Sequence, residues 1–294
     1  MTLLLARAPG TGEGAEPVAV RILFTNNANG KLTACDCPDD PYGGLAERVS
    51  LVTAYRETND DIVLVDSGGY FGLTEDTPEG RLILNLMARM GYDVIGVGDQ
   101  EVFQGLGTFL DRYGAYRGQM VNAALRDSRN NSVFEPYRIV TAGGIRIGII
   151  GLVSEETFRF FPGERHDFMV ADPDSVMTHL LPALADSCDY IMVLSQMGVE
   201  GDRRFAEKWP VVGLIIGGHS QTLLAEPLIV NGTVIVQAGK NGSRVGEIIL
   251  TREPDGTPGI ESYRLIEVKG EYPVGPDIRE LLEAASADSP VEKR

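Results

Sequence analysis

Short apolar runs alternate with helical patterns in the first half of the chain. Continuous apolar runs at residues 18–25, 61–66 and 94–97 are typical of buried strands, and each ends in a polar or glycine-rich stretch. Residues 45–56 and 80–90, between these runs, have the spacing of amphipathic helices. The alternation predicts βαβ units with parallel strands.

The second half of the chain is denser in strand patterns. Residues 137–141, 144–146 and 147–152 predict a hairpin that leads into a further strand. More strands are expected at 119–122, 190–195, 212–216, 233–238, 246–251 and 262–268, and helices at 107–113, 173–184 and 278–285. The chain is therefore predicted to be an α/β protein, in which ligand sites form beyond the carboxyl ends of the strands.

Composition narrows the function classes. The 294 residues are 43% hydrophobic, as in a globular protein with a sizeable core. No apolar run reaches the roughly 18 residues of a membrane span. The net charge of -16 disfavours nucleic acid as a partner, because binding it depends on basic side chains that neutralise phosphates. Three cysteines are too few for a disulfide scaffold.

The polar loops that follow the predicted strands form nine motif blocks in order. They read Phe24-Thr25-Asn26-Asn27-Ala28-Asn29-Gly30, Gly43-Gly44-Leu45-Ala46-Glu47-Arg48, Asp66-Ser67-Gly68-Gly69, Gly98-Asp99-Gln100-Glu101-Val102-Phe103, Val121-Asn122-Ala123, residues 144–152, Leu194-Ser195-Gln196-Met197-Gly198, Gly217-Gly218-His219-Ser220-Gln221 and Val236-Gln237-Ala238-Gly239. This order resembles the 5′-nucleotidase-like, calcineurin-like metallophosphoesterases. The resemblance implies a four-layer α/β/β/α sandwich of two mixed sheets.

The same resemblance implies where the family's two catalytic cations would be held. Such enzymes bind a pair of divalent ions through carboxylates and imidazoles, and the ions activate a water molecule and clamp phosphate oxygens. The family's positions fall here on Asn27, Asn29, Gly69 (the bridging Asp), Asp99, Gln196, His219 and Gln221, and its His–Asp pair for the transition state falls on Gln100 and Phe103.

These substitutions change the chemistry that the loops can support. Without a bridging carboxylate at Gly69, two cations would repel each other strongly at short range. No two-metal centre is therefore expected, and no cofactor is assigned. A hydrogen-bonded cluster of amides in the old ligand space is the favoured state. One divalent or soft ion at Asp99, His219 and Gln221, with Gln196 beside it, stays open as an alternative.

A second candidate feature is the thiol pair Cys35 and Cys37 in the loop after the first predicted strand. Two thiols at this spacing bind a soft ion such as Cu(I) or Zn(II), cycle between dithiol and disulfide, or simply fix a long loop. The arrangement resembles a bacterial subset of nucleotidase-like proteins with a C-x-C motif before G-G-L-A-R. All three interpretations stay open.

The predicted organisation has one main domain with flanking segments. Residues 1–17 are expected to be a disordered leader or a trimmed signal, although no complete signal peptide is evident. Residues 18–268 form the metallophosphoesterase-like domain, and residues 269–294 a linker-like helix and frayed tail. The second, nucleoside-binding domain that follows in related nucleotidases is not expected here.

The function hypothesis is a catalytically degenerate phosphoesterase that serves as an accessory or binding module, with the thiol loop as its functional feature. A residual single-metal phosphoester hydrolase is one alternative, and a scaffold subunit that docks a larger redox complex is another. A protein partner stays open and cannot be named from the residues. The resemblance implies a periplasmic or extracellular location.

Overall fold

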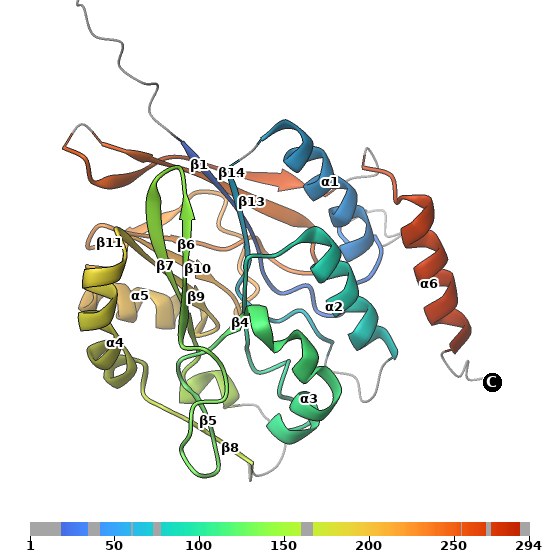
Figure 1. Cartoon of the computed structure of the whole chain (residues 1–294), viewed down its shortest axis with the longest axis horizontal. Helices are drawn as coiled ribbons and strands as arrows, with labels where there is room; N and C mark the ends of the chain where they lie inside the picture. Colours follow the sequence, from blue (N-terminus) through green and yellow to red (C-terminus); the bar gives the residue numbers. More distant parts are fainter. Residues whose placement is uncertain are drawn as a thin grey trace, which may run out of the picture.

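Two six-stranded mixed sheets face each other in the computed structural model, with helices on their outer faces (Figure 1). The structure describes residues 19–34, 42–59, 61–72, 78–159, 167–253, 255–268 and 272–288. The expected leader at 1–17 therefore lies outside the described residues. The four-layer α/β/β/α arrangement predicted from the sequence is confirmed.

The first sheet carries the early βαβ units. Its order is β14 (Pro258–Glu267), β13 (Arg244–Arg252), β1 (Val20–Thr25), β2 (Ile62–Asp66), β3 (Val94–Gly96) and β4 (Met120–Val121). Strands β1 to β4 run parallel, and β13 pairs antiparallel with both β1 and β14. Its outer face is covered by α1 (Leu45–Thr58), α2 (Pro78–Met90), α3 (Leu106–Tyr113) and α6 (Pro276–Asp288) (Figure 1).

The second sheet comes from the strand-dense half of the chain. Its order is β11 (Leu228–Val230), β12 (Thr233–Val236), β10 (Leu214–Gly217), β9 (Tyr190–Ser195), β7 (Ile145–Leu152) and β6 (Tyr137–Ala142). The four inner strands run parallel, and both edge strands are antiparallel. Helices α4 (Pro173–Ser187) and α5 (Gly198–Lys208) pack on its outer face.

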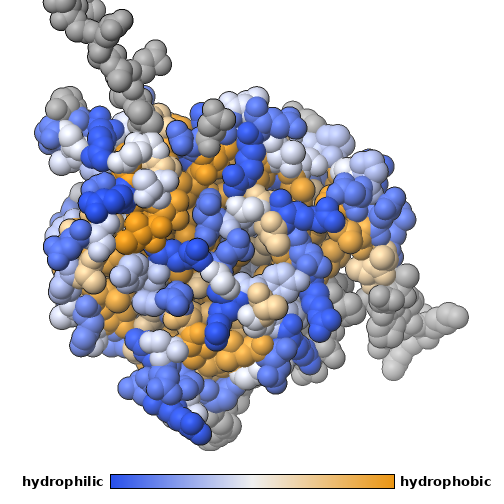
Figure 2. Space-filling model, viewed as in Figure 1, coloured by the Kyte–Doolittle hydropathy of each residue, from blue (hydrophilic) through white to orange (hydrophobic). Residues whose placement is uncertain are grey.

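Apolar side chains from the inner faces of both sheets form the central core. Phe24 and Val65 of the first sheet pack in one buried cluster with Ile147, Leu194 and Ile216 of the second. The face of the molecule in Figure 2 is mainly polar, with apolar patches between charged side chains. This core fixes the two sheets against each other, so the loops at their carboxyl ends meet at one edge.

Helix α5 and the small ribbon of β5 (Leu125–Asp127) and β8 (Phe168–Val170) were not predicted from the sequence. Gly198 and Gly201 lower helix propensity at the start of α5, and charged residues obscure its apolar stripe. The helix forms because Phe205 and Ala206 are buried against the second sheet. Tertiary packing, and not local propensity, therefore determines the helical conformation of α5.

Candidate functional site

The predicted site residues come together where the parallel strands end. The loops after β1 and β2 are joined by a hydrogen bond from the backbone N–H of Asn27 to the carbonyl of Gly68, 2.9 Å long. The loop after β10 joins them, because the backbone N–H of His219 donates to Oδ1 of Asn27 at 2.9 Å. Loops from both sheets therefore meet at the edge where the resemblance places the family's metal site.

Asn27 is the centre of this junction. It is 2% exposed, and its Nδ2 donates to the carbonyl of Gly239 at 3.1 Å while its Oδ1 accepts from His219. Its φ of 47° lies in the left-handed region, which asparagine tolerates better than most side chains. Both ends of the Asn27 amide are therefore used to hold neighbouring loops.

Asn29 extends the same amide cluster toward the surface. Its Nδ2 donates to Oδ1 of Asn241 at 3.0 Å, and its Oδ1 accepts from Nε2 of Gln100 at 3.0 Å. Turning the Gln100 amide over would instead let its nitrogen donate to the carbonyls of Gly69 and Phe71, each at 2.9 Å. In either orientation, the Gln100 amide is held by hydrogen bonds within the site.

Gly69 is the residue that the resemblance matches to the family's bridging carboxylate. Its φ is 73°, and a Cβ atom added there would lie 2.9 Å from Oδ1 of Asn27 and 3.2 Å from Oε1 of Gln100. Contacts this short with Cβ require the surroundings to shift. A side chain at this position would therefore displace the Asn27 and Gln100 amides from their present places.

Glu101 is a functional-site residue that the sequence interpretation missed. Its carboxylate accepts four backbone N–H groups, from Gly69 and Gly98 at Oε2 and from Tyr70 and Phe71 at Oε1. Burial raises the pKa of Glu101 to about 7, and the N–H groups of Gly69, Gly98 and Phe71 oppose that rise by stabilising the anion. Glu101 thus fixes the loops after β2 and β3, and its place in the fourth motif block was the available signal.

Asp99 and His219 face each other across the site. Oδ1 of Asp99 lies 3.5 Å from Nδ1 of His219, and the two side chains are 20% and 30% exposed. The hydrogen bond and the negative charge of Asp99 raise the pKa of His219. Among the residues predicted to hold a metal ion, Asp99 and His219 are therefore a pair in which a carboxylate stabilises a protonated imidazole.

Gln196 is buried behind this pair in a hollow between loop glycines. A Cβ atom at Gly218 would lie 2.0 Å from its Nε2, and one at Gly98 would lie 2.7 Å from its Cγ. Neither Oε1 nor Nε2 has a hydrogen-bond partner in the described part of the chain, although the residue is only 1% exposed. An unpaired buried amide is costly, so this group is available to a ligand or a water molecule.

Asp202 on α5 is a second residue that the sequence interpretation missed, and it has no sequence signal because the helix itself was not predicted. It is fully buried and accepts a hydrogen bond from Ser195, while its Oδ2 has no partner among the described residues. Burial raises the pKa of Asp202 to about 7, and its negative charge also raises the pKa of His219. The negative charge of Asp202 therefore stabilises the protonated form of His219.

The remaining predicted residues are only partly placed. Gln221 lies exposed in the loop of His219, and Phe103 lines a cavity with Gln100. Cys35 and Cys37 lie outside the described residues, so their proposed chemistry stays a prediction. Within the described ranges, no three His, Cys, Asp or Glu side chains gather closely enough to hold a metal ion.

Comparison with known proteins supports the relationship that the motif order indicates. No family model matches the chain. A snake venom 5′-nucleotidase from Gloydius brevicauda is 28% identical over 216 residues, which cover 70% of this chain and 36% of that protein. The chain thus spans about a third of the length of this curated relative.

Solved structures extend the match over most of the chain. The 5′-nucleotidase precursor from Thermus thermophilus has a TM-score of 0.80 at 26% identity, over 92% of this chain and 58% of that chain. The calcineurin-like phosphoesterase YfkN from Bacillus subtilis has a TM-score of 0.73 at 21% identity, over 92% and 97%.

The two facing sheets, with the loops gathered at their carboxyl edge, have the fold of the calcineurin-like phosphoesterases. Within that fold class, the relatives with the matching sequences are 5′-nucleotidases, and the chain is similar to a part of them. None of the helices among the described residues combines the length and apolar character that crossing a membrane requires.

Proposed function

We propose that this domain is a catalytically degenerate member of the 5′-nucleotidase-like group and acts as an accessory or binding module. The observation that carries the proposal is the amide cluster around Asn27. Both ends of the Asn27 amide are engaged in hydrogen bonds, and its Oδ1 stands 2.9 Å from where a Cβ of residue 69 would be. The space of the bridging carboxylate is therefore used to bind loops together.

The residues present do not fit a pair of divalent cations. Such a pair needs anionic oxygen ligands, and among the mapped positions only Asp99 offers one. Asp99 already faces His219, whose positive form it stabilises. The amides of Asn27 and Asn29 are neutral and hold protein partners in hydrogen bonds. These residues therefore do not support hydrolysis through two metal ions.

Turnover assays test the degeneracy directly. The purified chain is incubated with p-nitrophenyl phosphate and with adenosine monophosphate, in separate series with Mn²⁺, Zn²⁺, Co²⁺ and Ca²⁺. We expect no turnover above that of a matched His219→Ala variant. Metal-dependent turnover of either substrate that disappears in His219→Ala would contradict the proposal.

A single-ion hydrolase is the second candidate, and one distance favours it. Two ligands bound to one ion at about 2.0–2.1 Å with a tetrahedral angle lie about 3.4 Å apart. The Asp99–His219 separation of 3.5 Å agrees with this value, and the unpaired amide of Gln196 lies in the adjoining loop. Calorimetric titration with Zn²⁺ checks this candidate, which requires one tight site that is lost in both Asp99→Asn and His219→Ala.

The accessory role includes the thiol pair Cys35 and Cys37. Gly44, a described residue that follows the pair in the sequence, is joined to the amide cluster, since its N–H donates to the carbonyl of Asn241 at 3.4 Å and Asn241 binds Asn29. Thiol titration and metal analysis of anaerobically purified protein test whether the pair binds a soft metal or changes redox state. If neither occurs in the wild type, the thiol part of the proposal fails.

The proposed location is outside the cytoplasm. The Thermus thermophilus relative is described as a precursor, which supports export for the group.

A further inference from the structure

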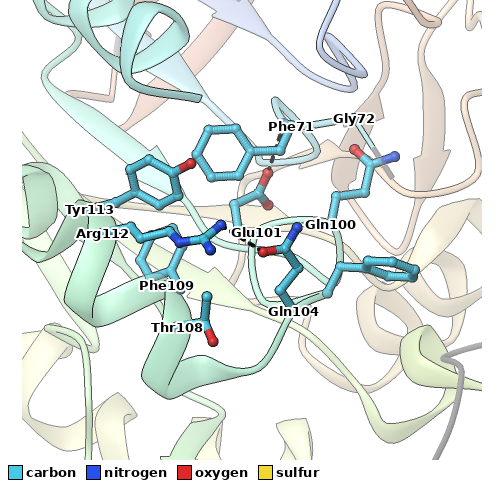
Figure 3. Close-up of a pocket in the computed structure, with 10 residues that line it drawn as sticks. Phe71, Gly72, Gln100, Glu101, Gln104, Thr108, Phe109, Arg112 and Tyr113 are labelled. Carbon is cyan, nitrogen blue, oxygen red and sulfur yellow. Dashed lines mark hydrogen bonds between the residues drawn. The ribbon is translucent and has the colours of Figure 1, made fainter. Parts of the chain in front are cut away.

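A cleft of about 430 Å³ is bounded by the short helix η2 (Glu155–Phe158), by the loop between β8 and α4, and by the first turns of α5. This volume is within the roughly 300–1,000 Å³ of ordinary ligand sites. The cavity beside Gln100 in Figure 3 has about 40 Å³, which is room for only a few water molecules. The positions mapped to the family's metal site are all described residues, and none of them lines the cleft. The cleft is therefore a separate feature with space for a small organic molecule.

The floor of the cleft is apolar and belongs to the core of the second sheet. Met197 and Phe205 line it and are only 8% and 4% exposed, and both pack in the buried cluster under α4 and α5. Val170 and Pro173 line the same cleft and are half-buried. A thioether and an aromatic ring both make favourable contacts with a second ring. The floor therefore suits the aromatic body of a ligand.

The rim of the cleft is acidic. Four of the described residues that line it carry carboxylates: Glu155, Glu156, Asp172 and Asp174. Nη2 of Arg204, which also lines the cleft, lies 2.7 Å from Oε2 of Glu156, and Nζ of Lys208 lies 2.6 Å from Oδ2 of Asp174. If Arg159 of the adjoining cavity is counted as well, four carboxylates face three cations, which leaves one negative charge in excess.

Asp172 is the carboxylate that accounts for this excess. It caps α4, because its Oδ2 accepts the backbone N–H of Ser175 at 2.9 Å. In the described part of the chain, no basic side chain forms an ion pair with Asp172. A carboxylate has about four lone-pair sites, so the exposed Asp172 can accept further hydrogen bonds while it keeps the cap. The cap therefore holds one carboxylate in place at the edge of an apolar floor.

We propose that this cleft binds a small aromatic monoamine, with its ring against Met197 and Phe205 and its ammonium group at Asp172. The volume, the apolar floor and the single excess negative charge together define this ligand class. A metal ion does not fit, because among the described residues no three acidic side chains gather closely enough to hold one. The site needs none of the predicted metal ligands, so it is independent of whether the domain is catalytically degenerate.

Ligand-observed NMR titration with phenethylamine tests the site, at an ionic strength held constant with sodium chloride. 2-Phenylethanol has the same ring and chain with a neutral hydroxyl group, and ethylamine has the charge without the ring. We expect phenethylamine to bind about fivefold more tightly than 2-phenylethanol, the value of one partly exposed ion pair. We expect at least about a tenfold preference over ethylamine, because the ring is removed from water.

Asp172→Asn and Asp186→Asn form a matched pair of variants. Asparagine caps a helix about as well as aspartate, so α4 keeps its first turn in Asp172→Asn. Asp186 is an exposed residue of the same helix, but it lies about 21 Å further along the helix axis and does not line the cleft. The affinity for phenethylamine should fall about fivefold in Asp172→Asn and stay unchanged in Asp186→Asn, and that for 2-phenylethanol should change in neither.

Three results would overturn the proposal. The first is that phenethylamine does not bind to the wild-type chain. The second is that 2-phenylethanol or ethylamine binds as tightly as phenethylamine, since the charge or the ring would then contribute nothing. The third is that Asp172→Asn and Asp186→Asn bind phenethylamine alike, which would place the ammonium group away from Asp172.

Discussion

Replacing Asn27 with alanine measures how strongly the amide cluster holds the loops. The substitution removes two side-chain hydrogen bonds, to the backbone of His219 and of Gly239, each contributing about 0.5–1.5 kcal/mol. Alanine is also less tolerant than asparagine of the left-handed φ of 47°, at a cost of about 1 kcal/mol. We therefore expect a loss of about 2–4 kcal/mol in the free energy of unfolding.

Urea unfolding followed by the fluorescence of Trp209, the one tryptophan of the chain, gives this value. Asn130→Ala is the matched control, because Asn130 has a φ of 66° in an exposed turn. The control carries the backbone cost without the buried hydrogen bonds, so the difference between the two variants isolates the network at about 1–3 kcal/mol. If Asn27→Ala is no more destabilising than Asn130→Ala, the cluster does not hold the site together.

Three further substitutions test other parts of the structure by the same urea assay. Gly69→Ala should lower the free energy of unfolding by about 2–4 kcal/mol through backbone strain and overpacking. Gly256→Ala is the control, because Gly256 has a φ of 87° with open space around it, and it should cost about 1 kcal/mol. Equal losses in the two variants would refute close packing at Gly69. Glu101→Gln should cost about 2–4 kcal/mol, because its amide nitrogen would face backbone N–H groups, and a loss under 0.5 kcal/mol would show that these contacts are weak. Hydrogen bonds from Arg146 lower the pKa of Asp189 to about 2 from 3.8, so the stabilisation is present above pH 3.8 and is lost as the pH falls through 2. The cost of Asp189→Asn should therefore be about 1 kcal/mol at pH 7, after solvent screening, and should shrink between about pH 4 and pH 2; a pH-independent cost would contradict this.

The fold was predictable because its signals are local and repeated. Buried parallel strands leave continuous apolar runs, and the loops after them carry the polar motif blocks in order. Helix α5 was not predicted because its two glycines and many charged residues mask the spacing of its apolar residues in the sequence. These apolar residues form a buried stripe only when the helix packs on the second sheet. The ribbon of β5 and β8 is too short for a period to be read.

The candidate site was predictable as a set of positions, but its contacts were not. The motif order pointed to Asn27, Asn29 and Gly69 and predicted that the family's usual ligands are missing there, which stays a prediction. Which amide binds which partner depends on loops about 200 residues apart, such as Asn29 and Asn241, and no periodic pattern encodes such a pair. Glu101 was overlooked because its partners are backbone groups, which leave no trace in side-chain identity.

The metal stoichiometry of the site tests the central claim most directly. Mn²⁺ suits this measurement because it prefers oxygen and nitrogen ligands to thiolates, so Cys35 and Cys37 interfere little. The chain is dialysed to equilibrium against Mn²⁺, and the bound ions are counted and examined by electron paramagnetic resonance. The account predicts at most one ion per chain and no spin-coupled pair. Two bound ions with a coupled signal that disappears in His219→Ala would contradict it.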